Sequence, residues 1–365
     1  MVRERKIKMK NKHGANIFEI SRDYGLALKD IADFSSNINP MGASPKAKLK
    51  VKDNIDLVSA YPDTDYIDLK NAISNYSGAR KEDILLFTGT TEGLIEYIRL
   101  INPKNSLVFA PSYSEYEHEL KKIKSTIHYY YLKEEEGFRV DVNRLIKQIK
   151  DNKIDLLVFS NPSNPTGTAL EKNDIEKILK QTDTHLLVDE TYVEFTDTKK
   201  FSSVELTKTY PNLFTLRGTS KFFAMPGIRL GYGIISSEPI KSSIETNEML
   251  WNINIFADLM GQASFADRDF IKSVEDFVSA ERSFIKKELD KIDEIKSYDF
   301  YGNFILSKIL NESTAKELRN SLLPYGLVIR DCSNFKGLGE KYFRFCILDK
   351  KSNRRLIEKI AEYFA

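Results

Sequence analysis

Short apolar runs alternate with amphipathic stretches through the middle of the chain. The runs cover residues 84–87, 106–110, 156–159, 186–188 and 213–216. Continuous apolar runs of this length are typical of strands that are buried on both faces of a sheet. Stretches with a helical period, such as residues 174–180, lie between them. This alternation predicts an α/β fold in which helices flank a mainly parallel sheet.

The pattern changes after about residue 264, where charged helical stretches and scattered apolar runs take over. The charged stretch covers residues 270–292, and the later apolar runs cover 304–306, 327–329 and 342–345. This order is typical of a smaller α+β domain, and 365 residues are too many for one simple core. We expect an N-terminal segment (1–45) that joins the small domain, a large domain (46–260) and a small C-terminal domain (261–365).

Polar residues stand where the apolar runs end. Ligands of α/β sheets bind beyond the carboxyl ends of the strands, so these residues are candidates for a site. Gly89, Thr90 and Thr91 follow the first run and open a helix, where exposed backbone N–H groups favour a phosphate. Asn164 and Asp189 follow two later runs. Taken singly, Asn164 is also explained as a turn residue and Asp189 as a helix N-cap.

Lys221 is the residue with the most distinctive surroundings. It stands behind Thr219 and Ser220 in an apolar stretch, and Arg229 follows eight positions later. A lysine amine forms a Schiff base with an aldehyde, and an arginine grips a phosphate as a planar fork. Desolvation by apolar neighbours favours the neutral, nucleophilic amine. The pair therefore suits an aldehyde cofactor that carries a phosphate.

The ordered set of these motifs resembles the pyridoxal-phosphate (PLP) enzymes of the aminotransferase superfamily, fold type I, class I/II. The resemblance implies a seven-stranded, mainly parallel sheet in the large domain, and it names Lys221, Asp189 and Tyr192 as catalytic residues. Lys221 would hold the cofactor aldehyde, and Asp189 would pair with the pyridine nitrogen. The further cofactor contacts that it implies are Gly89, Thr90, Thr91, Tyr113, Asn164, Tyr192, Ser220 and Arg229.

The assembly is also implied by the resemblance. Tyr61, in the motif Ala60-Tyr61-Pro62-Asp63, resembles a tyrosine that reaches the phosphate bound by a neighbouring subunit. A homodimer with shared sites is therefore expected.

Motifs outside the cofactor site resemble those of threonine-phosphate decarboxylases. They lie at residues 13–16, 34–40, 251–254 and 329–338. The reaction implied is decarboxylation of L-threonine O-3-phosphate to aminopropanol phosphate, a step toward the cobalamin side chain, or of L-serine phosphate to ethanolamine phosphate. Transamination of the histidinol-phosphate aminotransferase type is the alternative. Tyr113 and Tyr192 stand where phenylalanine is expected in decarboxylases, and Gly218 stands where a hydroxyl residue is common, so the reaction type stays open.

A phosphorylated amino acid presents two anionic groups, and arginine matches both carboxylate and phosphate oxygens with two hydrogen bonds. Arg344 fits the family's carboxylate arginine. Arg330, with His13 and Asn37, is expected to contact the substrate's own phosphate. The plain alternatives are a surface cation for Arg330 and a solvated side chain for His13.

The composition excludes several other classes of protein. The 55 basic and 53 acidic residues are well mixed and give a net charge of +2, which argues against a nucleic-acid partner. No apolar run approaches the length of a membrane span. Cys332 and Cys346 lack metal-ligand spacing, and the four histidines are scattered, so we expect no metal. With two cysteines in the chain, we expect a cytoplasmic setting. We interpret the acidic cluster at 134–136 as a solvated loop.

Overall fold

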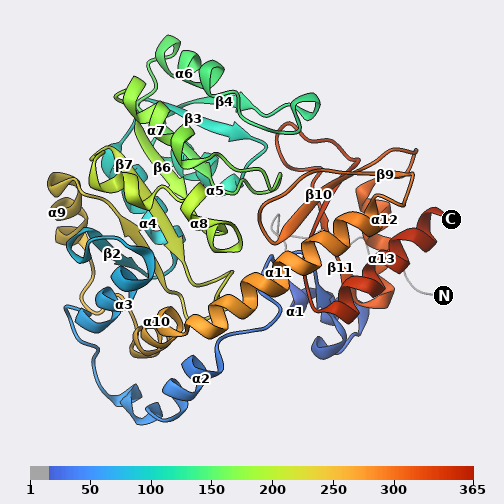
Figure 1. The fold of residues 1–365 in the computed structure, drawn as a ribbon, viewed down its shortest axis with the longest axis horizontal. Helices are drawn as coiled ribbons and strands as arrows, with labels where there is room; N and C mark the ends of the chain where they lie inside the picture. Colours follow the sequence, from blue (N-terminus) through green and yellow to red (C-terminus); the bar gives the residue numbers. More distant parts are fainter. Residues whose placement is uncertain (1–15) are drawn as a thin grey trace.

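The computed structural model describes residues 16–365. His13, which we expected to support the substrate's phosphate, lies outside the described residues. Two unequal parts follow one another along the chain, and the long helix α11 (Arg268–Leu289) runs from the larger part to the smaller one (Figure 1).

Seven strands form the central sheet within the described residues, in the order β2-β8-β7-β6-β5-β3-β4. Their bounds are β2 (Ile84–Phe87), β3 (Asn105–Ala110), β4 (Thr126–Tyr131), β5 (Leu156–Ser160), β6 (His185–Asp189), β7 (Leu213–Gly218) and β8 (Gly231–Ile234). Strand β8 runs antiparallel to its neighbours β2 and β7, and the other pairs are parallel. The expected α/β class with a mainly parallel sheet is confirmed.

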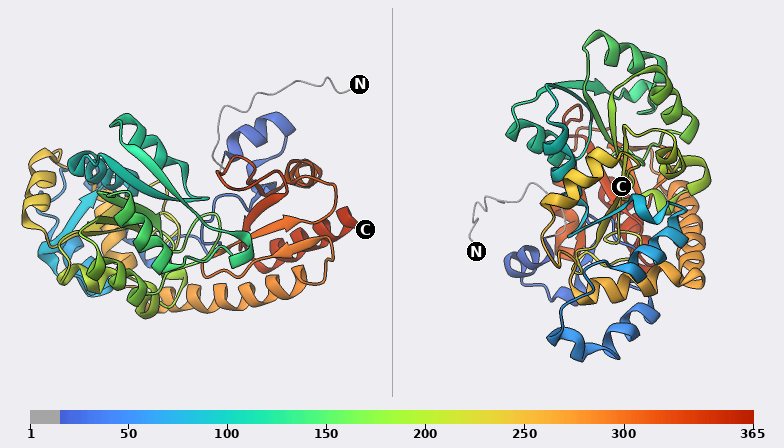
Figure 2. Two further views of the ribbon diagram at one scale, coloured as in Figure 1. Left: turned by 90° about the horizontal axis from the view of Figure 1, so that it is seen from above. Right: turned by 90° about the vertical axis from the view of Figure 1, so that its left-hand side faces the viewer.

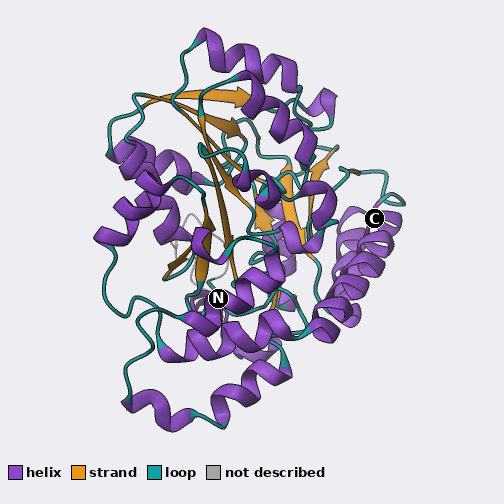
Figure 3. Ribbon diagram, turned by 60° about the vertical axis from the view of Figure 1, so that its left-hand side comes forward, coloured by secondary structure: helices purple, strands orange, loops and turns teal. Residues whose placement is uncertain are grey.

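Helices cover both faces of this sheet, as its apolar strands require (Figure 3). One face packs against α4 (Thr90–Ile101), α5 (Ser114–Lys122) and α9 (Glu238–Asn247). The other face packs against α6 (Val142–Asp151) and α7 (Lys172–Gln181). The remaining helices of this part are α2 (Pro45–Lys52), α3 (Ile67–Ser77), α8 (Thr198–Phe201) and α10 (Ile255–Ala266).

The smaller part contains a second sheet, in the order β12-β13-β10-β9. Its strands are antiparallel and comprise β9 (Ile295–Ser297), β10 (Phe304–Ile309), β12 (Arg330–Asp331) and β13 (Tyr342–Cys346). Its helices are α12 (Ala315–Leu322) and α13 (Lys350–Phe364). The helix α1 (Ile17–Tyr24) leads to β1 (Ala32–Asp33), which pairs in parallel with β11 (Leu327–Val328), so the segment from α1 to β1 lies against the C-terminal part of the chain (Figure 2).

Glu134 joins the two parts of the molecule. Its carboxylate accepts hydrogen bonds from the hydroxyls of Tyr298 and Tyr342, at 2.7 and 2.6 Å. The amines of Lys296 and Lys308 donate to it at 2.9 and 2.8 Å. Our interpretation of the acidic cluster as a solvated loop is therefore wrong for Glu134, because its four partners lie on or directly after strands that are distant in sequence. This contact helps to fix the smaller sheet relative to the larger one.

Candidate active site

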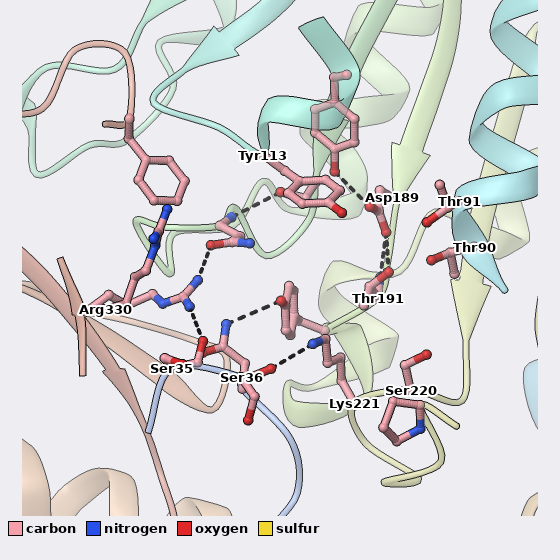
Figure 4. Close-up of a pocket in the computed structure, with 18 of the residues that line it drawn as sticks. Ser35, Ser36, Thr90, Thr91, Tyr113, Asp189, Thr191, Ser220, Lys221 and Arg330 are labelled. Atoms are coloured by element: carbon pink, nitrogen blue, oxygen red, sulfur yellow. Dashed lines mark hydrogen bonds between the residues drawn. The ribbon is translucent and has the colours of Figure 1, made fainter. Parts of the chain in front are cut away.

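A cavity of about 270 Å³ lies where the carboxyl ends of β5 and β6 meet the smaller sheet and the N-terminal segment (Figure 4). The predicted site residues that line it are Asn37, Thr90, Thr91, Tyr113, Asn164, Asp189, Tyr192, Ser220, Lys221, Arg229, Arg330 and Arg344. Figure 4 shows Arg330 across the cavity from Thr90, Thr91 and Ser220. Residues from three distant parts of the sequence thus surround one space.

The start of helix α4 forms one end of the cavity. Gly89 precedes the helix with φ +86°, and a Cβ atom there would lie 2.3 Å from Nη2 of Arg229. Gly89 therefore lets the guanidinium approach the helix N-terminus, where free N–H groups favour an anion. Position 218 also requires glycine for a steric reason, because a Cβ atom on Gly218 would lie 2.6 Å from Cγ2 of Thr90. The side chain of Thr90 thus occupies the space that a hydroxyl side chain at position 218 would need.

Lys221 projects into the cavity from the loop between β7 and β8. Its Nζ donates a hydrogen bond to the carbonyl oxygen of Ser36 at 2.7 Å. The following residues Phe222 and Phe223 are buried in the core, which anchors the backbone on which the lysine stands. The amine is thus held at the cavity wall by the N-terminal segment.

Asp189 ends strand β6 and is 9% exposed. Its Oδ1 accepts from the backbone N–H of Thr191 at 3.0 Å and from the Thr191 hydroxyl at 2.5 Å. Its Oδ2 accepts from the hydroxyl of Tyr116 at 2.7 Å. Burial raises the pKa of Asp189, and the hydrogen bonds from Thr191 and Tyr116 act in the opposite direction. Asp189 lines the cavity and caps no described helix, so the N-cap alternative does not hold.

Arg344 on β13 is 5% exposed and makes two contacts with carbonyl groups. One donor reaches Oδ1 of Asn164, and Nη2 reaches the carbonyl oxygen of Ser35 at 2.7 Å. Because Asn164 uses its oxygen in this way, its amide hydrogens remain donors for a ligand. Among the described residues, Nε of Arg344 has no hydrogen-bond partner.

Arg330 stands directly opposite Arg344 in the β12–β13 ladder. Its guanidinium donates to Oδ1 of Asn334 at 2.8 Å and lies 5.3 Å from the ring centre of Phe335. Burial lowers the pKa of Arg330, and the charge of Arg344 lowers it further. Like charges that face each other across a ladder are unfavourable unless an anion lies between them. Because Arg330 lines the cavity, it is no ordinary surface cation.

Asn37 and Tyr192 lie together in the cavity wall. Nδ2 of Asn37 donates to the hydroxyl of Tyr192 at 3.2 Å, and Asn303 donates to the backbone oxygen of Asn37 at 3.0 Å. Asn37 is 1% exposed, and its Oδ1 has no hydrogen-bond partner among the described residues. This oxygen is therefore an acceptor that a ligand or water can use.

Tyr61 does not line this cavity. Its side chain is 77% exposed and stacks on Trp251, with ring centres 4.2 Å apart. Nothing in residues 16–365 therefore brings Tyr61 to the site.

Several cavity residues were not predicted. They are Ser35, Ser36, Tyr116, Ser160, Thr191, Pro226 and Phe335. Ser35 and Ser36 contribute backbone carbonyls to Arg344 and Lys221, which no sequence pattern reveals. Tyr116 could have been predicted from the sequence, because it lies one helical turn after Tyr113 and must therefore lie on the same side of the helix.

The residues that surround the cavity fit PLP. Lys221 supplies an amine, Tyr113 an aromatic face, Asp189 a buried acid, and the start of α4 with Arg229 a phosphate cradle. The free amide hydrogens of Asn164 and the hydroxyl of Tyr192 match an anionic phenolic oxygen.

Behind Asp189 the chain carries a buried ionic cluster. Nε of Arg217 donates to Glu190 at 2.9 Å, and Nη1 lies 4.0 Å from Oε1 of Glu194. Neither oxygen of Glu194 has a hydrogen-bond partner among the described residues. Burial raises the pKa of Glu194 from its ordinary value of 4.5 to about 7, and the charge of Arg217 opposes this. Glu194 is therefore a buried acid that holds its proton in weakly acidic solution.

Glu194→Gln is expected to alter how stability depends on pH. Between pH 4.5 and 7 the folded protein keeps a proton that the unfolded chain releases, so wild-type stability falls as pH rises through this range. The variant has no such proton. We take the difference between the free energies of unfolding of wild type and variant. As the pH rises from 4.5 to 7, this difference should fall by on the order of 3 kcal/mol, as urea unfolding of both proteins would measure. Parallel pH curves would show that Glu194 is already ionised.

Comparisons with known proteins agree with the geometry of the cavity. A family model of class I and II aminotransferases matches residues 29–360. A provisionally named threonine-phosphate decarboxylase from Caldanaerobacter subterraneus subsp. tengcongensis is 38% identical over 95% of this chain and 92% of its own length.

Two solved structures share the fold. Histidinol-phosphate aminotransferase from Clostridium acetobutylicum has a TM-score of 0.85 and 33% identity, covering 90% of this chain and 98% of that one. Histidinol-phosphate aminotransferase from Sinorhizobium meliloti, solved with pyridoxal 5′-phosphate, has a TM-score of 0.85 and 18% identity, with 96% of each chain covered.

None of the described helices combines the length and the apolar character that crossing a membrane requires.

Proposed function

The chain belongs to the class I and II aminotransferase family and is a PLP enzyme, and we propose that it decarboxylates a small phosphorylated amino acid. The observation that carries this proposal is the pair Arg330 and Arg344, which face each other across one ladder at the edge of the cavity. Two adjacent guanidinium groups match the carboxylate and phosphate of a compact dianion such as threonine phosphate or serine phosphate.

The chain's own residues divide the work as follows. Bound PLP withdraws electrons from the bonds at the substrate's Cα. Lys221 holds the cofactor by its amine and moves a proton at Cα. Asp189 would keep the proton on the ring nitrogen, and Asn164 with Tyr192 would bind the phenolic oxygen. Tyr113 would cover the ring, and Thr90, Thr91, Ser220 and Arg229 would bind the cofactor phosphate, with Gly89 giving them room.

The orientation of the substrate carboxylate would select the reaction, because it decides which bond at Cα breaks. We propose that Arg344 and Arg330, acting at the two ends of the substrate, would hold the carboxylate in the orientation from which carbon dioxide leaves. Cα would then receive a proton from Lys221. Asn37 lies beside Tyr192 and supports the bound substrate. The resemblance also assigns His13 to the phosphate end.

The alternative is an aminotransferase, and the 33% identity with the Clostridium acetobutylicum enzyme favours it. Histidinol phosphate carries a phosphate but no carboxylate, so it would use Arg330 and leave Arg344 without an anion. The amino-group acceptor would then need Arg344 in the second half-reaction. The two reactions therefore differ in their products and in their demand on Arg344.

One assay separates the two. The purified enzyme with PLP is incubated with threonine phosphate or serine phosphate, and released carbon dioxide is measured. A parallel incubation uses histidinol phosphate with 2-oxoglutarate, and glutamate is measured. Carbon dioxide release with no glutamate supports the proposal. Glutamate formation without carbon dioxide replaces it with transamination.

We further propose that the enzyme acts as a homodimer. Large apolar side chains of the α2–α3 region and of the segment before α10 are exposed, namely Leu49, Ile55, Val58, Tyr61, Ile67, Met249, Leu250 and Trp251. The stacking of Tyr61 on Trp251 joins the two segments. A second copy of the chain is the natural cover for exposed apolar surface of this extent. Tyr61 would then reach the cofactor phosphate in the partner subunit.

Trp251→Glu is expected to convert the dimer to monomers, because a charge in an apolar interface loses its hydration without gaining a partner. Sedimentation velocity should give about 84 kDa for wild type, twice the 42.0 kDa chain, and about half of that for the variant. Leu310→Glu is the matched control, since Leu310 is also exposed but lies in the smaller part. A wild-type monomer at micromolar concentration would contradict the assembly.

A further inference from the structure

Tyr116 is a fully buried tyrosine whose hydroxyl reaches the cofactor site. It lies on α5 one turn after Tyr113, and its ring meets that of Tyr113 edge-on, with centres 5.5 Å apart. Its hydroxyl donates to Oδ2 of Asp189 at 2.7 Å. Burial raises the pKa of Tyr116 well above its usual value, and the charge of Asp189 raises it further. The hydroxyl therefore keeps its proton and acts as a donor to the carboxylate.

Ser160 stands beside this contact. It is the direct neighbour of Asp189 in the β5–β6 register, and its hydroxyl accepts from the backbone N–H of Asn164 at 3.0 Å. A carboxylate can only accept, so the proton of the Tyr116 hydroxyl points toward Asp189.

Donors from neighbouring elements hold both oxygens of the Asp189 carboxylate. Thr191 supplies both donors to Oδ1. Tyr116 is the donor to Oδ2. Hydrogen bonds are electrostatically stronger in a site of low dielectric, so these contacts fix the orientation of the carboxylate.

We propose that Tyr116 is a positioning residue that, through its hydrogen bond to Oδ2, holds the Asp189 carboxylate ionised and turned toward the cofactor ring nitrogen. The inference rests on the role of Asp189 in the proposed function. It does not depend on which amino acid is the substrate or on whether carbon dioxide leaves. The edge contact with Tyr113 gives Tyr116 a second role, since it limits movement of the ring that covers the cofactor.

Tyr116→Phe tests the proposal because it removes the hydroxyl and keeps the ring. Apoenzyme is prepared by removing the cofactor, and PLP is titrated back while its visible absorbance is recorded. The dissociation constant for PLP is expected to rise about tenfold, the usual effect of losing one hydrogen bond to a charged group. The visible band is expected to shift in wavelength, since the ring nitrogen loses part of its ionic partner.

Tyr97→Phe is the matched control. Tyr97 is as buried as Tyr116 and also lies on a helix against the sheet, but its hydroxyl lies 3.3 Å from Nδ1 of His185, away from the cavity. It should bind PLP like wild type. Thermal unfolding of the two apo variants shows whether each has folded. If Tyr116→Phe folds and binds PLP as tightly and with the same band as Tyr97→Phe, the positioning role is overturned.

These measurements use the cofactor alone, without an amino-acid substrate. Failure of the carbon dioxide assay would leave these binding measurements valid, so the two proposals fail separately.

Discussion

Lys221→Ala is expected to remove the visible absorbance of the lysine-bound cofactor and to lower turnover by at least about a thousandfold. Lys221 is the lysine of the described chain that lines the cavity, so its loss removes both the covalent anchor and the base that moves the Cα proton. The loss should be the same for every amino acid tried, because both steps are common to decarboxylation and transamination. Absorbance spectra and single-turnover rates of the two proteins measure it.

Borohydride reduction gives the direct check on this assignment. Reduction of wild type should fix the cofactor to one peptide that contains Lys221, and the variant should give no labelled peptide. Lys199→Ala is a suitable control, because Lys199 lies on the surface in α8 and should leave labelling unchanged. Labelling of wild type at any other lysine would contradict the site as argued.

The sheet shows how far a pattern of apolar residues predicts a fold. Strands β2, β3, β5, β6 and β7 are buried on both faces, and each gave an apolar run that could be found directly. Strand β4 lies at the edge of the sheet and Tyr130 is its one buried residue, and β8 contains Gly231 and Gly233 in four residues, so neither gave such a run. Burial on both faces, rather than strand geometry, is what the pattern detects.

The site was predicted where function depends on side-chain chemistry. Lys221, Asp189 and Arg229 were found because a lysine, a strand-end acid and an arginine occur in a fixed order, and all three line the cavity. What could not be predicted depends on register and backbone. The Ser36 carbonyl that holds Lys221 is one such feature, and the contact of Tyr116 with Asp189 needs β5, β6 and α5 to be placed first. Tyr61 stays a prediction, since its role needs a second chain.

The substrate arginines lead to the sharpest test of specificity. Arg344 is buried on β13 and bonded to Asn164 and Ser35, whereas Arg330 stands on the adjacent strand against Asn334 and Phe335. The two guanidiniums are neighbours but belong to different surroundings. We expect Arg344 to bind the carboxylate that every amino acid carries, and Arg330 to bind the phosphate that only the phosphorylated ones carry.

Arg330→Ala is expected to reduce kcat/KM for threonine phosphate by roughly 30-fold to several thousandfold, because losing one partner of a buried charge pair costs about 2–5 kcal/mol. Any activity toward threonine should change little. Arg344→Ala should impair both substrates by similar factors. Comparing kcat/KM for the two substrates in both variants measures the transition-state contribution of each arginine separately.

Arg330→Lys separates charge from geometry in the same experiment. Lysine keeps the positive charge but cannot form the planar fork that binds two phosphate oxygens, so it should recover only part of the loss seen with alanine. If Arg330→Ala harms threonine and threonine phosphate equally, Arg330 has a structural role through Asn334 and Phe335 rather than a phosphate-binding one. The carboxylate would then be the only substrate anion with an arginine, and a compact dianion would lose its physical support as the substrate.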